Sequence, residues 1–325
     1  MTSEAMIDAV VVDKHEEAVD IVVLELAARD GGSLPPFGAG SHVDVEIKPG
    51  LIRQYSLCNA PDAWQQYTLG VLREPASRGG SAAIHQEVMV GTHLRISEPR
   101  NHFSIAAGDR HILFAGGIGV TPLLCMAERL SKSHQTFELH YCARSLERAA
   151  FRSRIASSSF SECVFYHYDD GPPSQRLDLD RAFSEWSVQR DASTHIYVCG
   201  PAGYIDAVSA HARGRGWPDT HIHVEHFSGE VLIQDGEASF QVEIASTGKI
   251  YTIPADQPVT VALADHGVDI PVSCEQGVCG SCATRILSGE PDHRDYYLSD
   301  QERREGMIFT PCCSRAKSRL LVLDL

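Results

Sequence analysis

The chain is short of positive charge. Its 325 residues include 28 Lys and Arg against 43 Asp and Glu, which gives a formal net charge of −15. A protein that binds the backbone of a nucleic acid needs a concentrated face of Lys and Arg to displace counterions, and the sequence has no such run. The acidic balance is typical of a solvated surface, and we expect no nucleic acid partner.

Long apolar runs are also missing. No stretch approaches the roughly 18 uninterrupted apolar residues that a membrane-spanning helix needs. The N-terminal sequence MTSEAMIDAVVVDKHEEAVD carries acidic residues where a signal peptide needs a basic flank. We therefore expect a cytoplasmic protein that does not enter a membrane and whose thiols are reduced.

The length indicates several domains, because 325 residues exceed what one hydrophobic core usually supports. Residues 1–106 contain short strand-like runs separated by Gly and Pro turns, with one helix-like insert over 80–88. Several short strands at this spacing predict an antiparallel β-barrel.

Residues 107–228 show a different rhythm, in which strand-like runs alternate with helical segments such as 121–132 and 146–157. This alternation predicts a parallel α/β sheet with helices on both faces. Residues 229–237 are expected to form a linker. The last domain, 238–325, opens with a predicted hairpin around Thr247-Gly248, so the fold class is multidomain.

Five of the ten cysteines lie after residue 273, and three of them fall within the nonapeptide CEQGVCGSC. Cys274, Cys279 and Cys282 have the spacing C-x4-C-x2-C, and the pair Cys312-Cys313 follows about 30 residues later, as in plant-type [2Fe–2S] proteins. A zinc site normally shows paired C-x2-C knuckles, and only one close pair occurs here. The spacing leaves both members of the later pair open as the fourth ligand.

Two glycines of this loop agree with the cluster hypothesis. A backbone that curls tightly around a cluster turns its N–H groups towards the sulfurs and sometimes takes positive φ. Gly277 and Gly280 are the small residues that such a loop requires.

An iron–sulfur cluster that transfers electrons needs a donor upstream in the chain, and a flavin that takes hydride from a nicotinamide could serve. Two motifs of the first domain suggest a flavin site. In the strand RQYSL, alternation places Arg53, Tyr55 and Leu57 on one face and Gln54 and Ser56 on the other. By itself this pattern is also that of an ordinary strand with an exposed arginine.

The second motif is RGGS, at the start of the helix-like insert. There an arginine, glycine N–H groups and a helix N-terminus could together hold a phosphate. The residues are Arg78, Gly79, Gly80 and Ser81.

In the second domain, GGIGVTP ends the first strand and opens its helix, where an open α/β sheet binds a pyrophosphate. The candidate residues are Gly116, Gly117, Gly119, Thr121 and Pro122, with Thr121 expected as the N-cap and Pro122 at the first helical position. The turn differs from the G-x-G-x-x-G fingerprint, so a purely structural role is the alternative.

Three further segments of the second domain contain candidate binding residues, two of them at strand ends where a nucleotide could bind. Cys199-Gly200-Pro201 ends the last central strand, although a cysteine there is also a common core residue. Arg144 follows a strand where an adenosine ribose could lie. Phe227, in VEHFSG, would otherwise be an apolar interdomain contact.

The segments CEQGVCGSCATRIL, PDHRD and FTPCCSRAKSRLLVLDL resemble the C-terminal ferredoxin domain of the phthalate dioxygenase reductase and vanillate demethylase reductase family. The resemblance spans nearly the whole chain, from the RQYSL strand to LVLDL. It implies an α+β ferredoxin domain of the β-grasp type, with Cys312 as the fourth ligand and Cys313 as a buried neighbour.

The resemblance also implies the flavin and nucleotide sites. Arg53 pairs with the FMN phosphate, together with the RGGS residues. Tyr55 lies against the isoalloxazine, Ser56 hydrogen-bonds near its reactive nitrogen, and Phe227 covers the ring. Cys199 lies near the carbon of the nicotinamide that gives up hydride. FAD is used by related barrels, and NADPH remains an alternative to NADH.

The expected function is thus an NADH-dependent flavin and iron–sulfur oxidoreductase, the monomeric reductase component of a Rieske-type non-haem iron oxygenase acting on a small, often aromatic, compound. The protein would position the cofactors, and the cofactors would carry the chemistry. The alternatives are a reductase for another acceptor, such as a cytochrome P450 or a separate ferredoxin, and an iron–sulfur redox sensor without reductase activity.

Overall fold

The computed structural model describes residues 6–63, 65–75, 78–187, 194–227 and 237–325. The chain divides into two compact units, with the boundary between Phe227 and Ser228. Of the linker predicted at 229–237, all but Glu237 lies outside the described residues. Within the described part of the chain, no helix has both the length and the apolar character needed to cross a membrane.

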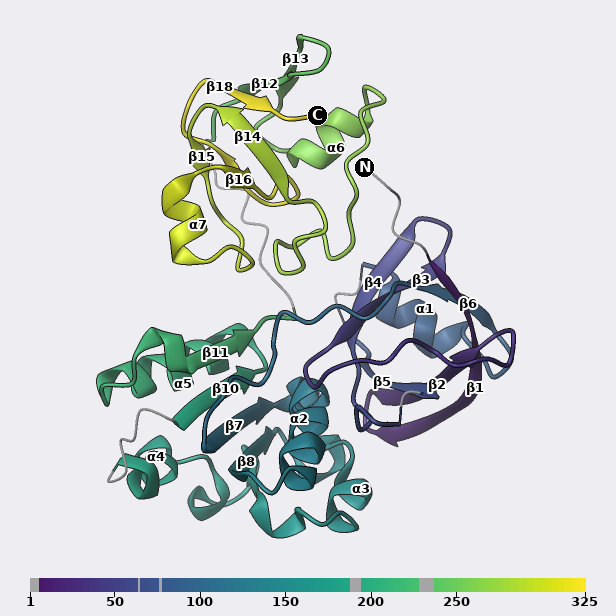
Figure 1. The fold of residues 1–325 in the computed structure, drawn as a ribbon, viewed down its shortest axis with the longest axis vertical. Helices are drawn as coiled ribbons and strands as arrows, with labels where there is room; N and C mark the ends of the chain where they lie inside the picture. Colours follow the sequence, from purple (N-terminus) through teal and green to yellow (C-terminus); the bar gives the residue numbers. More distant parts are fainter. Residues whose placement is uncertain (1–5, 64, 76–77, 188–193, 228–236) are drawn as a thin grey trace. The chain divides into compact units, whose positions relative to one another are not determined.

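The first sheet contains six antiparallel strands in the spatial order β4-β3-β6-β1-β2-β5 (Figure 1). Their bounds are β1 (Ile7–Ala18), β2 (Ile21–Ala28), β3 (His42–Lys48), β4 (Leu51–Ser56), β5 (Gln66–Leu72) and β6 (His93–Ile96). A bridge between Leu57 and Leu69 joins the end of β4 to β5, so the two outer strands meet and the sheet closes into the predicted barrel. Its interior is filled by apolar side chains such as Leu24 and Val43.

The helix-like insert is α1 (Gly80–Gln86), between β5 and β6. Its C-terminal end is held by Lys14 of β1, whose ammonium donates to the carbonyl oxygens of Ile84, His85 and Val88 at 2.8, 2.9 and 2.6 Å. These bonds satisfy carbonyls that a helix end leaves without partners, and they fix α1 against the barrel.

The second sheet contains five parallel strands in the order β11-β10-β7-β8-β9, as the alternating pattern predicted. The strands are β7 (Arg110–Gly116), β8 (Thr136–Ala143), β9 (Val164–Tyr168), β10 (Thr194–Cys199) and β11 (Ile222–Glu225), and the helices are α2 (Val120–Lys132), α3 (Arg152–Ala156), α4 (Leu179–Ser187) and α5 (Ala202–Gly214). Leu113 and Ala115 of β7 pack in the same core as α2, whereas Ile112 and Phe114 pack with α4 and α5 on the other face. Helices therefore cover both faces (Figure 1).

Two local expectations for this domain were wrong. Thr121 is not the N-cap of α2. The glycine-rich turn forms a 3-10 helix over Gly117–Gly119 and leads directly into α2, so Gly119 occupies the cap position and Thr121 Oγ1 donates to the Ile118 carbonyl at 3.0 Å. The helix begins at Val120, which leaves Pro122 as its third residue rather than its first.

The helical segment predicted over 146–157 is also interrupted. A 3-10 turn over Leu146–Arg148 is separated from α3 by residues 149–151, the last of which, Phe151, has φ +60°. The side chain of Phe151 is buried in the core that the barrel and the α/β sheet share. This tertiary packing accounts for a backbone conformation that the helical pattern does not foresee.

The barrel and the α/β sheet share side chains. Ile21 and Cys58 of the barrel belong to one apolar cluster with Met126 of α2. Glu17 of β1 accepts a 2.6 Å hydrogen bond from the backbone N–H of Phe151. The two sheets therefore form one compact unit, and the domain boundary at residue 106 stays a prediction.

The second unit contains a five-stranded mixed sheet in the order β13-β12-β18-β14-β16 and a two-stranded sheet, β15-β17. The strands are β12 (Phe240–Ile244), β13 (Lys249–Ile253), β14 (Thr284–Ser288), β15 (Pro291–Asp292), β16 (Ile308–Phe309), β17 (Arg315–Ala316) and β18 (Leu320–Leu323), and the helices are α6 (Val259–Ala264) and α7 (Asp300–Glu305). The predicted hairpin is present as β12 and β13, and β12 pairs in parallel with β18. Val259 and Leu263 of α6 pack with the sheet core.

Candidate redox site

The two nucleotide motifs follow adjacent strands. GGIG follows β7 and CGP follows β10, and these strands pair in parallel with Cys199 opposite Ala115. From β7 the chain proceeds to β8 on one side, while β10 lies on the other side. The motifs therefore lie at the topological switch point of the sheet, where open α/β folds bind their ligands.

The backbones of the two motifs are in close contact. A Cβ at Gly119 would lie less than 3.0 Å from the carbonyl oxygen of Cys199, nearer than real Cβ atoms approach. A Cβ at Gly116 would meet Pro201 at 3.0 Å. Gly117 has φ +56° and open space around it. Close packing against backbone atoms thus requires glycine at 119, tight packing disfavours a side chain at 116, and the backbone conformation favours glycine at 117.

A residue that the sequence pattern did not reveal lies beside these motifs. Glu225 of β11 pairs with Cys199 of β10, and its Oε2 accepts a 3.4 Å hydrogen bond from Ser56 Oγ of the barrel strand β4. Burial of the carboxyl group raises the pKa of Glu225 to about 8, although the Ser56 bond acts in the opposite direction. The carboxyl is therefore largely protonated at neutral pH.

Cys199 is completely buried. Burial, with a smaller contribution from the charge of Glu225, raises the pKa of its thiol well above the usual value. The thiol is neutral, which sets it apart from the activated thiolate of a cysteine nucleophile. Ser56, Cys199 and Glu225 thus bring a hydroxyl, a thiol and a protonated carboxyl together.

The two flavin motifs also meet. Arg53 donates to the carbonyl oxygens of Ile52 at 2.6 Å and Arg78 at 3.0 Å. A Cβ at Gly80 would lie 2.5 Å from Cγ of Arg53, so glycine is needed where α1 passes the arginine. Gly79, the residue before α1, has φ +89°. An arginine and a glycine-rich turn with helical N–H groups form a donor set that suits a phosphate.

The other predicted residues lie in different surroundings. Tyr55 packs partly against the barrel core, and burial raises the pKa of its phenol. Leu57 is fully buried in that core. Arg144 is exposed after β8, and Phe227 is 37% exposed two residues after β11. Ser81 accepts a hydrogen bond from the Glu74 N–H at 3.1 Å. The cofactor contacts of these residues stay predictions.

In the second unit, the four predicted cluster cysteines are buried and close together. Cys282 Sγ lies 3.2 Å from Cys312 Sγ. Cys274 interacts with both Cys279 and Cys312. Among the described residues no three His, Cys, Asp or Glu side chains converge on one metal ion. A [2Fe–2S] cluster needs only two thiolates at each iron, and the neighbouring pairs Cys274/Cys279 and Cys282/Cys312 could supply them.

The backbone of the cysteine loop supports the same fit. The N–H groups of Gln276 and Val278 point to Cys274 Sγ, and that of Ser281 points to Cys279 Sγ, each at 3.4 Å. Such N–H···S bonds stabilise the negative charge of thiolate ligands.

Cys313 has other neighbours. Its thiol contacts Thr310 and Ser314, and it packs against Gly277, where a Cβ would lie less than 3.0 Å from the sulfur. Cys313 is 4% exposed, as the resemblance implied for a buried neighbour of the ligand. These contacts favour Cys312 as the fourth ligand.

Family models match two parts of the chain. The oxidoreductase NAD-binding domain matches residues 113–210, and the 2Fe-2S iron-sulfur cluster binding domain matches residues 242–317. The first match covers both nucleotide motifs, and the second covers all four cluster cysteines. The fold and these sites define a nicotinamide-dependent iron–sulfur oxidoreductase.

Similar proteins cover almost the whole chain. The vanillate O-demethylase oxidoreductase of Pseudomonas putida is 49% identical over 98% of this chain and 100% of its own. A solved structure of phthalate dioxygenase reductase, titled as a modular structure for electron transfer from pyridine nucleotides to [2Fe-2S], is 36% identical with a TM-score of 0.75, covering 99% of this chain and 98% of its own. An intact type IV self-sufficient cytochrome P450 monooxygenase is 37% identical with a TM-score of 0.85, covering 98% of this chain but 41% of its own.

The chain belongs to the family of oxygenase reductases that includes vanillate O-demethylase oxidoreductase and phthalate dioxygenase reductase. It is an NADH-dependent oxidoreductase, as predicted from the sequence. The predicted nicotinamide nucleotide and [2Fe–2S] cluster are also confirmed, as is the multidomain fold, and FMN is the flavin that membership of this family implies.

Proposed function

We propose that this chain transfers electrons from NADH to the terminal Rieske-type oxygenase of a two-component system. The observation that carries the proposal is the contact of Ser56 with Glu225 beside Cys199. It joins the predicted flavin strand to the edge of the sheet where a nicotinamide would lie. Two cofactors that exchange hydride have to meet at such a place.

The barrel residues fall into two sets, one that would bind the phosphate of FMN and one that would contact its ring. Arg53 and the residues Arg78, Gly79, Gly80 and Ser81 would bind the FMN phosphate, because they supply a guanidinium and backbone N–H groups within one small region. Tyr55, Ser56, Leu57 and Phe227 would contact the isoalloxazine. The Ser56 hydroxyl has one proton, which it donates to Glu225 in this structure, and it would turn this hydrogen bond to the ring when the flavin is bound.

The nucleotide would bind at the switch point. Gly116, Gly117 and Gly119, with Thr121 and Pro122, would accommodate the pyrophosphate, and Arg144 would lie towards the adenosine. Cys199, Gly200 and Pro201 would border the nicotinamide. The exposed guanidinium of Arg144 could also meet the 2′-phosphate of NADPH. The preference for NADH therefore rests on family membership and not on this residue.

When bound, FMN supplies the conversion between two-electron hydride transfer and single-electron transfer, and the cluster accepts one electron at a time. The residues beside the proposed flavin site would set the local charge and fill the space next to the ring. Glu225 keeps its proton at neutral pH and so places no full negative charge next to the hydride path. The neutral thiol of Cys199 fills the space at the end of β10 without competing as a nucleophile. Cys274, Cys279, Cys282 and Cys312 would ligate the cluster.

The acceptor follows from the relatives. The names vanillate O-demethylase and phthalate 4,5-dioxygenase describe oxygenation of small aromatic acids by the systems to which those reductases belong. We place this chain in a system of the same kind, as a cytoplasmic monomer that does not bind a membrane or nucleic acid.

A second acceptor is supported by one comparison. The match to a self-sufficient cytochrome P450 monooxygenase covers 98% of this chain with a TM-score of 0.85. This similarity supports a haem protein as the alternative acceptor. Family membership favours either reductase function over a redox sensor without reductase activity.

An anaerobic titration of the purified chain with NADH tests the proposal. We expect bleaching of the flavin absorbance followed by loss of the iron–sulfur bands, with FMN released on denaturation. Absence of flavin would contradict the barrel assignment. The reduced protein is then mixed with a Rieske oxygenase that demethylates vanillate and, separately, with a bacterial P450. Faster reoxidation by the Rieske protein supports the proposed acceptor, and faster reoxidation by the P450 contradicts it.

A further inference from the structure

The segment Asp295–Ser299 lies across the cysteine loop of the second unit. The backbone N–H of Tyr296 donates to the carbonyl of Gly277 at 2.9 Å. A Cβ at Gly280 would lie less than 3.0 Å from the ring of Tyr297, and one at Gly277 would lie 3.0 Å from Asp295. Both glycines have φ +73°. The tyrosine ring therefore covers the backbone between Cys279 and Cys282.

Asp295 holds this segment in shape. Its side chain has no exposed area, and its Oδ2 accepts the backbone N–H groups of Tyr297 at 3.1 Å and Leu298 at 2.7 Å. A carboxylate that accepts two backbone N–H groups in this way fixes a tight turn. The turn sets the direction in which the Tyr297 side chain leaves the backbone.

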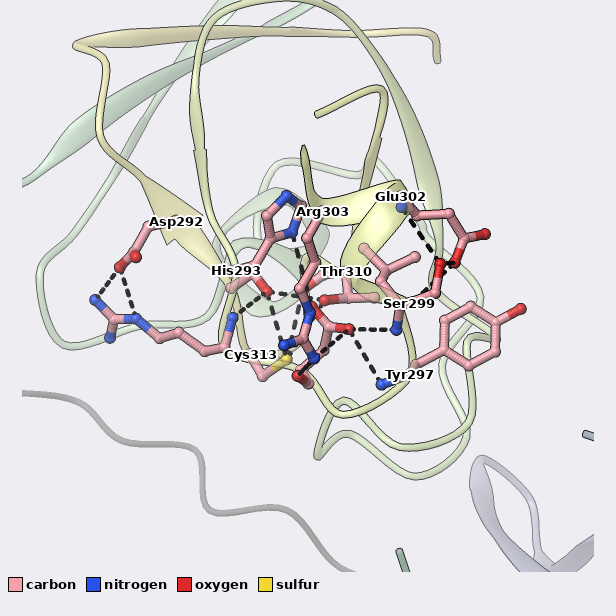
Figure 2. Close-up of polar contacts among 12 residues, drawn as sticks. Asp292, His293, Tyr297, Ser299, Glu302, Arg303, Thr310 and Cys313 are labelled. Atoms are coloured by element: carbon pink, nitrogen blue, oxygen red, sulfur yellow. Dashed lines mark hydrogen bonds and ion pairs between the residues drawn. The ribbon is translucent and has the colours of Figure 1, made fainter. Parts of the chain in front are cut away.

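Helix α7 supports the turn from the other side. Arg303 of α7 donates to the carbonyl oxygen of Asp295, and its guanidinium lies 3.8 Å from Asp295 Oδ2. The helix starts with a reciprocal capping box between Ser299 and Glu302, with distances of 2.8 and 3.3 Å, which Figure 2 shows at its first turn. The position of Arg303 therefore depends on a helix that is itself well anchored.

We propose that Asp295 is a positioning residue that holds Tyr297 as a cover over the cysteine loop, and that this cover keeps water and oxygen away from the cluster. The proposal rests on the cluster assignment made above. The covered backbone includes the N–H group of Ser281, which points to the sulfur of Cys279. Solvent that reached this backbone would compete for that N–H group and weaken the ligand environment.

The test measures cluster lifetime in the complete protein rather than turnover. Purified variants with reconstituted clusters are exposed to air, and the visible iron–sulfur absorbance is followed with time. For Tyr297→Ala we expect the half-life to fall about five-fold or more, whereas Tyr297→Phe, which keeps the ring, has the wild-type half-life. Asp295→Ala should resemble Tyr297→Ala, and Asp295→Asn, which keeps an acceptor for the turn, should lie close to wild type.

Equal half-lives in wild type, Tyr297→Ala and Asp295→Ala would overturn the proposal. A half-life as short in Tyr297→Phe as in Tyr297→Ala would also overturn it, because the ring would then not be the shield. Iron content at time zero shows whether each variant formed the cluster, which separates this idea from failure of the ligand assignment. If Asp295→Ala does not fold, the Tyr297 pair decides alone. Ferricyanide reduction by NADH, which needs only the first unit, should match wild type in every variant.

Discussion

The hydroxyl of Ser56 and the carboxyl of Glu225 lie 3.4 Å apart although 169 positions separate them in the chain. The contact connects β4 of the barrel with β11 at the edge of the parallel sheet, beside Cys199. It places a carboxyl that keeps its proton at neutral pH where the proposed flavin and nicotinamide sites would adjoin.

Glu225 should make the first unit less stable as pH rises. Its pKa is about 8 in the folded chain and 4.5 for the ordinary group, so between these values the folded state binds more protons than the unfolded state. Unfolding free energy then falls with pH by at most about 1.4 kcal/mol per pH unit. Glu225→Gln keeps the neutral hydrogen-bonding shape and should lose this slope between pH 5 and 8. Thermal unfolding of both proteins is monitored by the release of flavin at a series of pH values. Identical pH slopes for wild type and Glu225→Gln would disprove the raised pKa of Glu225.

Gly119→Ala should weaken nucleotide binding. The added Cβ meets the carbonyl of Cys199, and relief of that overlap must move the GGIG turn away from the CGP strand. Overpacking of this kind costs about 1–3 kcal/mol, so the dissociation constant of NAD⁺ should rise about ten-fold or more. Isothermal calorimetry gives the constant. Gly203→Ala is the matched control, because nothing lies within 4 Å of the Cβ it adds.

Arg53→Ala should lose flavin before it loses anything else. A hydrogen bond to a charged group contributes about 1.5–3 kcal/mol, which corresponds to a dissociation constant for FMN roughly 10- to 100-fold higher. Flavin content of the purified protein and fluorescence titration of the apoprotein measure the effect. Arg95→Ala removes another barrel arginine, which is paired with Glu46 at 2.9 Å, and should leave flavin content unchanged. Full flavin occupancy in Arg53→Ala would remove the residue from the phosphate site.

Cys282→Ser should leave the reduction of the flavin by NADH intact and abolish electron transfer to an external acceptor. The serine variant loses a proposed cluster ligand, while the first unit retains all its residues. Reduction of the flavin by NADH in a stopped-flow experiment should keep its wild-type rate, and reduction of cytochrome c should fall about 100-fold or more, since a lost cofactor is worth several kcal/mol of barrier. Parallel loss of both steps would show that the units do not act in sequence.

The two neighbouring cysteines should behave differently. Cys312 contacts Cys282 and Cys274, whereas Cys313 contacts Thr310, Ser314 and the backbone of Gly277. We expect Cys313→Ser to retain iron and the cluster spectrum, and Cys312→Ser to lose both. Iron analysis with electron paramagnetic resonance of the reduced protein distinguishes them, and a cluster that survives in Cys312→Ser would assign the fourth ligand to Cys313.

Local sequence determined much of this protein. The spacing of Cys274, Cys279 and Cys282 and the glycines between them specify a cluster loop, because ligand number and backbone curvature are local requirements. The alternation of strands and helices over 107–228 specifies a parallel sheet, because this pattern too depends on residues that are neighbours in the sequence. Local patterns also held a missed signal, the Ser299 and Glu302 capping box that begins α7.

Only the tertiary structure decided which distant residues meet. The elevated pKa of Glu225 arises from burial beside β4, and no pattern around VEHF reports what covers it. The hydrogen bonds from Lys14 to the end of α1 likewise connect segments far apart in the chain. The ring of Tyr297 packs against Gly280, from which it is separated by several turns of the chain. Desolvation and close packing depend on neighbours in space, whereas propensity and spacing depend on neighbours in sequence.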